Sequence, residues 1–205
     1  MRKTRLFIDT EFTGLHQDAT LISIGVVSET GKHFYMELSD YDQEQIDDWL
    51  LEHVIGNLVM AEPFAGEQEY YSVSRHHDNP LGTDIYESYS IQLRGDSSLL
   101  KIELEKWLGQ FGEVEMWSDC LAYDWMLFNE IWGGALEIPD NVYYIPFDIS
   151  TMFKIKGIDP DVDREEFAEV AMPHPANTSF SPKHNALWDA ELIMKCFNKM
   201  MISDN

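Results

Sequence analysis

Two acidic residues, Asp9 and Glu11, follow the short apolar run of residues 6–8 near the start of the sequence. Side chains two positions apart in a strand leave the same face, so Asp9 and Glu11 are expected side by side, with Thr10 on the other face. Like charges at that spacing repel each other, and a divalent metal ion relieves the repulsion. The pair therefore predicts a metal site; a solvated strand end is the alternative for so short a motif.

Two further acids, Asp124 and Asp189, fall on predicted helices. Asp124 is followed by Leu127, Phe128 and Ile131 at helical spacing, which places it on the apolar stripe of its helix. Asp189 lies at the margin of the apolar stripe of the last predicted helix. Both acids are therefore expected to point toward protein, and a helix cap is the alternative role for Asp124.

A histidine, His184, stands five residues before Asp189 and just after Pro182, so we expect it on the loop that enters the last helix. An ordinary surface histidine is the alternative. Carboxylates are the ligands that Mg²⁺ or Mn²⁺ prefer, whereas zinc prefers thiolate and imidazole. Two such ions, about 3.5 to 4 Å apart, would activate a water and stabilise the departing oxygen of a phosphodiester. The predicted ligands are Asp9, Glu11, Asp124 and Asp189.

The elements that must position these residues alternate along the chain. Strands are predicted at residues 6–8, 21–27, 33–38, 114–117 and 142–147. Helices are predicted at residues 43–54, from a cap at Ser97 or Ser98 to about residue 109, and at residues 123–132 and 185–200. This order predicts an α/β fold whose mixed central sheet has antiparallel first strands and parallel later strands and is flanked by helices.

The length of 205 residues fits a single domain, residues 1–205. Residues 56–98 are irregular in pattern, with a candidate strand at residues 70–73, and are interpreted as an insertion rather than a second domain. The charge-rich residues 159–169 are interpreted as a solvated helix or loop face.

The chain is strongly acidic, with 37 Asp and Glu against 14 Lys and Arg and a formal net charge of −23. That balance excludes a broad basic surface for phosphates, so any nucleic-acid site must be local. The two cysteines cannot form a disulfide framework and favour a reducing, cytoplasmic compartment. No apolar run has the length of a membrane span or of a signal-peptide core.

Three segments resemble, in order and spacing, the three exonuclease motifs of the DEDDh superfamily: IDTEFTGL at residues 8–15, AYD at 122–124 and HNALWD at 184–189. The nearest resemblance is to RNase AS-like (RNase T-like) 3′ exoribonucleases, through residues 21–27 and through AYD leading into IWG at residues 131–133. The resemblance implies a ribonuclease H-like fold, two divalent ions and stepwise release of nucleoside 5′-monophosphates from a 3′ end.

The resemblance also implies a role for each matching residue. Asp9, Glu11, Asp124 and Asp189 would hold the metal ions, and His184 would be the general base. Nearby carboxylates are expected to raise the pKa of His184 from about 6.5, and metal ions to offset that rise. The segment that binds substrate is expected to be Phe12, Thr13, Gly14 and Leu15. Its backbone groups would contact the terminal nucleotide, and the apolar side chain of Leu15 would wedge against the base. A homodimer is an expectation from the resemblance alone.

Several functions stay open. RNA is favoured over DNA only because the nearest resemblance is to RNA enzymes, and the net charge of −23 favours short or frayed single-stranded 3′ ends. A dinucleotide or nucleotide-cofactor phosphodiester is another substrate class for the same site. A non-catalytic acidic protein that mimics nucleic acid is the alternative from a different class, and it would need outward-facing carboxylates.

Overall fold

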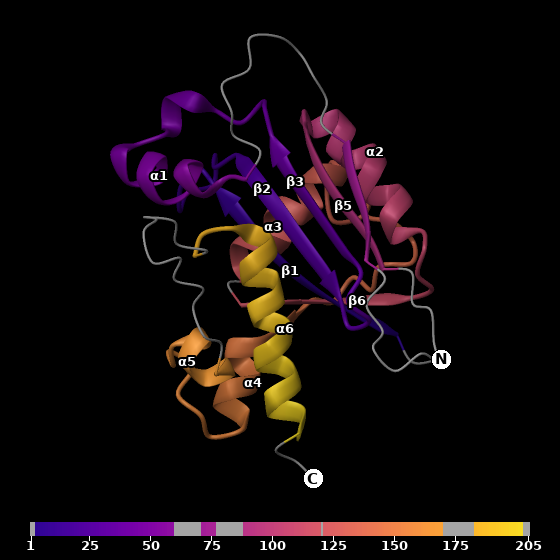
Figure 1. The fold of residues 1–205 in the computed structure, drawn as a ribbon, viewed down its shortest axis with the longest axis vertical. Coiled ribbons are helices and arrows are strands. Elements are labelled where there is room, and N and C mark those ends of the chain that lie inside the picture. Colours follow the sequence, from indigo (N-terminus) through magenta and orange to yellow (C-terminus); the bar gives the residue numbers. More distant parts are fainter. Residues whose placement is uncertain (1–2, 60–70, 77–87, 120, 170–182, 203–205) are drawn as a thin grey trace.

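Seven strands form one mixed sheet in the order β4-β5-β3-β2-β1-β6-β7 (Figure 1). The structure, a computed structural model, describes residues 3–59, 71–76, 88–119, 121–169 and 183–202, with backbone only for 71–76 and 88–90. The strands are β1 Thr4–Phe12, β2 Leu21–Ser28, β3 His33–Leu38, β4 Tyr71–His76, β5 Ser88–Gly95, β6 Val114–Ser118 and β7 Phe147–Asp148.

The strand directions confirm the predicted class of fold. The first three strands pair antiparallel, β6 runs parallel to β1, and β7 runs parallel to β6. The order β3-β2-β1-β6-β7 with these directions is that of a ribonuclease H-like fold. Beyond this set, β5 pairs parallel with β3 and β4 pairs antiparallel with β5. Both extra strands fall within residues 56–98. The interpretation of that stretch as an insertion stays a prediction, and part of it lies outside the described residues.

Helices cover both faces of the sheet. They are α1 Asp48–His53, α2 Ser97–Leu108, α3 Leu121–Trp132, α4 Ile149–Ile155, α5 Arg164–Ala168 and α6 Ala186–Ile202, with short 3-10 turns η1 Gln43–Gln45 and η2 Ile55–Asn57. One core lies between the sheet and α2 and α3, and includes Leu6 and Ile8 of β1. A second core, which includes Phe7, lies between the sheet, α4 and α6 (Figure 1). The alternation along β1 therefore assigns odd-numbered side chains to the α6 face and even-numbered ones to the α3 face.

Several predicted elements differ in extent from those observed. The helix predicted at residues 43–54 is divided into η1 and α1, because the Asp47 carboxylate accepts the N–H of Leu50 at 2.8 Å and starts a new helix at Asp48. Helix α2 is capped by Asp96 rather than Ser97 or Ser98. The strand predicted at residues 142–147 is reduced to β7 and a single bridge between Val114 and Val142.

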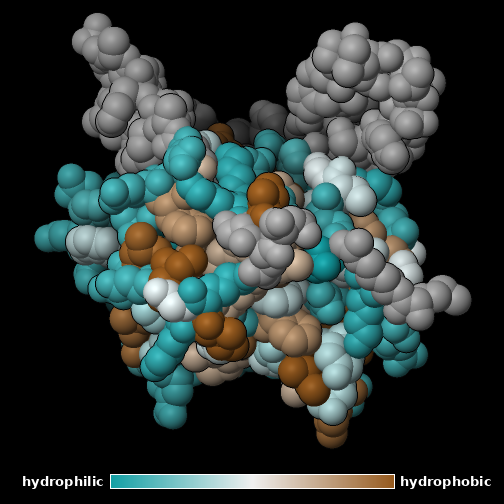
Figure 2. All heavy atoms as spheres, turned by 90° about the horizontal axis from the view of Figure 1, so that it is seen from below, coloured by the Kyte–Doolittle hydropathy of each residue, from teal (hydrophilic) through white to brown (hydrophobic). Residues whose placement is uncertain are grey.

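The face of the molecule seen from below is mainly hydrophilic (Figure 2). Seen from below, hydrophobic side chains form small separate groups among hydrophilic ones (Figure 2). Of the helices in the described part of the chain, each is too short or too polar to span a bilayer.

Candidate active site

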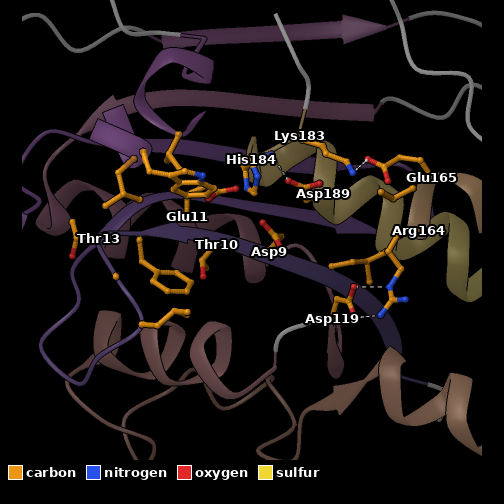
Figure 3. A pocket seen from close by; sticks show the side chains of 18 of the residues that line it. Asp9, Thr10, Glu11, Thr13, Asp119, Arg164, Glu165, Lys183, His184 and Asp189 are labelled. Carbon is orange, nitrogen blue, oxygen red and sulfur yellow. Dashed lines mark hydrogen bonds and ion pairs between the residues drawn. The ribbon is translucent and has the colours of Figure 1, made fainter. Parts of the chain in front are cut away.

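Three carboxylates meet where β1 lies against the start of α6. In the described part of the chain, Asp9, Glu11 and Asp189 each offer an oxygen atom, and these atoms lie within 4.8 Å of one another (Figure 3). Asp9 and Glu11 share the α6 face of β1, as their spacing predicted. Helix α6 can approach this closely because Asp9 faces a glycine, Gly25, on β2. Oxygen atoms at this separation fit the ligand set of a hard divalent cation.

The fourth predicted ligand, Asp124, is held differently. Its side chain is buried, as the apolar stripe predicted, with 1% of its surface exposed. One carboxylate oxygen accepts the N–H of Thr10 at 3.1 Å and its hydroxyl at 2.6 Å, and the other accepts the hydroxyl of Ser118. Thr10 points to the α3 face of β1, so Asp124 approaches the site from the opposite side of the strand. The structure therefore brings three of the four acids together and places Asp124 behind them.

Burial and mutual repulsion make these carboxylates unfavourable as anions. Burial first, then the charges of Asp189 and Asp124, raise the pKa of Glu11 to about 8. The pKa of Asp9 is raised well above its usual value by burial and then by Asp124, Asp189 and Glu11. The pKa of Asp189 rises to about 7, mainly through burial. Such a group of acids is stabilised as anions by a bound cation, so the residues present fit a divalent metal centre.

Burial also raises the pKa of Asp124, to about 6, but its hydrogen bonds act in the opposite direction. The donors from Ser118 and Thr10 favour the carboxylate form, and the pKa of Asp124 lies below those of Glu11 and Asp189. Asp124 thus retains its charge more readily than Glu11 at neutral pH.

His184 lies on the loop before α6, as predicted, in a left-handed backbone conformation with φ of +61°. Its N–H donates to the Asp189 carboxylate at 3.0 Å, and its ring meets the edge of Trp49 at 5.1 Å between centroids. The expected rise in its pKa is wrong: burial lowers the pKa, and the nearby His53 and Lys183 lower it further. The imidazole is therefore neutral at neutral pH and able to accept a proton.

Hydrogen bonds on both sides of His184 hold this unusual conformation. Before it, the side-chain amide of Asn57 donates to the carbonyl oxygen of Lys183 at 2.7 Å. After it, Asn185 accepts the N–H of Trp188 at 3.2 Å and so caps α6. A non-glycine residue at positive φ persists only where its surroundings fix it, and these bonds supply that constraint.

A pocket of about 850 Å³ opens over the carboxylates. Its walls include Leu15 and Trp49, two apolar side chains that are 73% and 49% exposed. Leu15 therefore makes little contact with the core. Trp49 of α1 lines the pocket and stacks on His53 at 4.8 Å between centroids. Both are flat or apolar surfaces available to a nucleobase.

The remaining residues of the predicted substrate segment also line the pocket. Phe12 stacks on Tyr123 at 5.2 Å, which joins the end of β1 to α3. Thr13 is buried, and its N–H donates to the carbonyl oxygen of Thr20 at 3.0 Å. Gly14 lies against His16, whose Nε2 would be 2.7 Å from a Cβ atom at this position. A role for any of these residues in substrate binding stays a prediction.

Sequence patterns missed a second group of pocket residues. Asp119 follows β6 and Arg164 begins α5, and their side chains pair inside the pocket (Figure 3). Residues 159–169 were interpreted as a solvated face, yet Arg164 is largely enclosed and Glu165 is buried. The single signal in the sequence was one arginine among many acids, which does not identify its partner.

The chain is similar to two curated proteins, but it is not assigned to a protein family. No protein family model matches the chain. Two curated proteins of Mycobacterium tuberculosis, 3′-5′ exoribonuclease Rv2179c of strain H37Rv and 3′-5′ exoribonuclease MT2234.1 of strain CDC 1551, are each 24% identical to it over 155 residues. The matched region covers 75% of this chain and 76% of each relative.

Among solved structures, the chain is similar to the catalytic unit of Neurospora crassa Pan2, which contains a protease and a nuclease domain. The TM-score is 0.45 and the identity 17%, with 98% of this chain covered. The chain spans 28% of the length of that structure. A similarity at this level supports no functional conclusion.

Proposed function

We propose that this protein is a divalent-metal-dependent 3′-5′ exonuclease that hydrolyses phosphodiesters at the 3′ end of RNA and releases nucleoside 5′-monophosphates. The observation that carries the proposal is the meeting of Asp9, Glu11 and Asp189 within 4.8 Å on the floor of a pocket, with the neutral imidazole of His184 beside them. The two mycobacterial relatives named 3′-5′ exoribonucleases support degradation from the 3′ end and RNA as the substrate.

Asp9, Glu11 and Asp189 would hold the metal ions, and Asp124, whose carboxylate accepts the hydroxyl of Thr10, is proposed as the fourth ligand. We propose two Mg²⁺ or Mn²⁺ ions, because four carboxylates exceed the charge of one divalent ion. When bound, such ions polarise the phosphodiester and stabilise negative charge on the departing oxygen.

His184 acts as the general base. It takes a proton from the attacking water as the new P–O bond forms, and the 3′ oxygen of the preceding nucleotide leaves. The backbone N–H of His184 donates a hydrogen bond to Asp189, which is a proposed metal ligand. This bond fixes the general base and the ligand in position relative to the reacting phosphate.

The terminal nucleotide is held by the pocket walls. Leu15 and Trp49 contact its base, because they are exposed apolar side chains at the pocket. Phe12, Thr13 and Gly14 line the same pocket, and we propose that backbone groups of this segment meet the sugar and phosphate. Contacts of this kind need no broad basic surface, which suits short single-stranded ends and a chain of net charge −23.

An acidic protein that mimics nucleic acid is the weaker candidate. A mimic must display its carboxylates to solvent, whereas Asp124 is 1% exposed and Glu11 is buried. These acids are directed into the molecule, as a metal site requires.

The test is degradation of matched 5′-labelled RNA and DNA oligomers by the purified protein with Mg²⁺, Mn²⁺ or chelator. We expect products that shorten by one nucleotide at a time, faster on RNA, with no product in chelator or from Asp9→Asn. Release of no mononucleotide from either strand with either metal would refute the proposal. Size-exclusion chromatography with light scattering on the same sample tests the homodimer that the family resemblance led us to expect.

A further inference from the structure

Among the other acids that line the pocket, Asp119 is bound at both carboxylate oxygens by an arginine. The Nε of Arg164 donates to one oxygen of Asp119 at 2.7 Å, and Nη2 donates to the other at 2.8 Å. Both residues line the pocket that contains Asp9 and Asp189 (Figure 3). Two parallel bonds of this kind form the strongest and most directional pairing between these two side-chain types.

The guanidinium group is fixed from several directions. Arg164 also donates to the hydroxyl of Ser150 at 2.8 Å and to the carbonyl oxygens of Pro160 at 2.8 Å and Val162 at 2.5 Å. Ser150 in turn donates to Asp119 at 2.7 Å. Asp119 is therefore held against the start of α4 and the loop before α5, and its orientation does not depend on the metal centre.

The charge of Asp119 nevertheless acts on the acids of the centre. It contributes to the raised pKa of both Asp9 and Asp124. Without Arg164, this carboxylate would add one full negative charge to a site that already contains four acids, and it would be free to turn toward a bound cation. The positive charge of Arg164, which lies against Asp119, offsets part of that negative charge.

We propose that Asp119 and Arg164 are a charge-compensated pair of positioning residues that keeps the Asp119 carboxylate off the divalent ions and thereby sets the affinity of the metal centre. The inference rests on the metal centre of the proposed function. It goes beyond it, because it assigns metal affinity to two residues that would not contact the ions.

If the pair acts through its charges, the two single variants should change the affinity for Mn²⁺ in opposite directions. Arg164→Gln removes a positive charge near the ions and frees Asp119, so Mn²⁺ should bind about fivefold more tightly. Asp119→Asn leaves the charge of Arg164 uncompensated, so Mn²⁺ should bind about fivefold more weakly. The double variant Asp119→Asn/Arg164→Gln, which restores neutrality, should bind Mn²⁺ like the unmodified protein. A purely structural pair predicts weaker binding in both single variants.

The measurement is calorimetric titration of the full chain with Mn²⁺ at pH 7.5, and thermal unfolding confirms that each variant is folded. Arg164→Lys, which keeps the charge, should bind as the unmodified protein does. Lys199→Gln, which removes a positive charge that pairs with Glu169 outside the pocket, is the matched control and should change nothing. Weaker or unchanged binding in Arg164→Gln, or failure of the double variant to cancel the single effects, overturns the inference. Failure of the unmodified protein to bind Mn²⁺ refutes the metal centre itself and is a distinct result.

Discussion

Gly25 on β2 lies directly beneath Ala186 at the start of α6. A Cβ atom on Gly25 would lie 2.2 Å from the carbonyl oxygen of Ala186, a contact with backbone that no side-chain rotation relieves. Gly25 is also the residue that pairs with Asp9 across the sheet. The missing side chain is therefore what lets α6 bring Asp189 to Asp9.

Gly25→Ala should push α6 away from the sheet. Overpacking of this kind costs about 1 to 3 kcal/mol, so we expect Tm to fall by roughly 5 °C. Mn²⁺ binding should weaken at the same time, because Asp189 moves from Asp9 and Glu11. Gly112→Ala is the control, since a Cβ there has open space around it. Equal Mn²⁺ affinity in Gly25→Ala and the unmodified protein would show that the approach of α6 does not build the site.

The buried acids predict an unusual dependence of stability on pH in the absence of metal. The pKa values of Glu11 and Asp189 are about 8 and 7 in the folded protein, above their usual values near 4. Between these limits the folded state binds more protons than the unfolded state, so the free energy of unfolding falls as the pH rises from about 4.5 to 8. Urea unfolding in chelator at pH 5 and pH 8 measures the fall.

Two comparisons isolate this effect from general repulsion in an acidic chain. Glu11→Gln should show a smaller fall, whereas Glu137→Gln, at an exposed position, should behave like the unmodified protein. Mg²⁺ at pH 8 should restore stability by binding the folded state. A fall of the same size in Glu11→Gln would mean that the site acids are not its cause.

His184→Ala should remove the base and leave the metal ligands in place. We expect kcat to fall by about 10² to 10⁴, with Mn²⁺ affinity kept. For the unmodified protein, the rate should rise through a pKa below 6.5, because only the neutral imidazole accepts the proton of the attacking water. His33→Ala on β3 serves as the control. Calorimetry that shows lost Mn²⁺ binding in His184→Ala would reassign the residue as a ligand.

Leu15→Ala and Trp49→Ala should weaken substrate binding. Loss of the contact with one base costs about 1 to 3 kcal/mol, which raises KM by about 5- to 150-fold. Trp49→Ala should also lower kcat, since Trp49 contacts His184, whereas Trp49→Phe keeps a ring and should retain more activity. Leu136, which is 96% exposed and outside the pocket, gives the control Leu136→Ala. An unchanged KM in both variants would remove these side chains from the substrate site.

Local periodicity was sufficient to predict the framework of the site. The two-residue repeat of a strand assigned Asp9 and Glu11 to one face, and the spacing of apolar residues predicted that Asp124 is buried. Both predictions depend only on residues within a few positions of each other in the sequence. The folded protein therefore keeps the predicted arrangement. The mixed sheet follows from the same kind of local pattern.

Contacts between distant segments were beyond such reasoning. Asn57 fixes the carbonyl of Lys183 across 126 positions, and Arg164 binds Asp119 across 45, with no motif that links the partners. The predicted rise in the pKa of His184 was wrong for the same reason. Its direction depends on burial and on His53 and Lys183 as neighbours, whereas sequence reasoning assumed that carboxylates surround the ring.

Asp9, Glu11 and Asp189, with Asp124 behind them, are proposed to bind a pair of divalent ions. Anomalous diffraction from crystals grown with Mn²⁺ tests it most directly. We expect two peaks about 3.5 to 4 Å apart, within ligand distance of these carboxylates and away from Asp119. Crystals soaked in Mn²⁺ that show no peak at these side chains, or peaks only elsewhere on the acidic surface, would contradict the account.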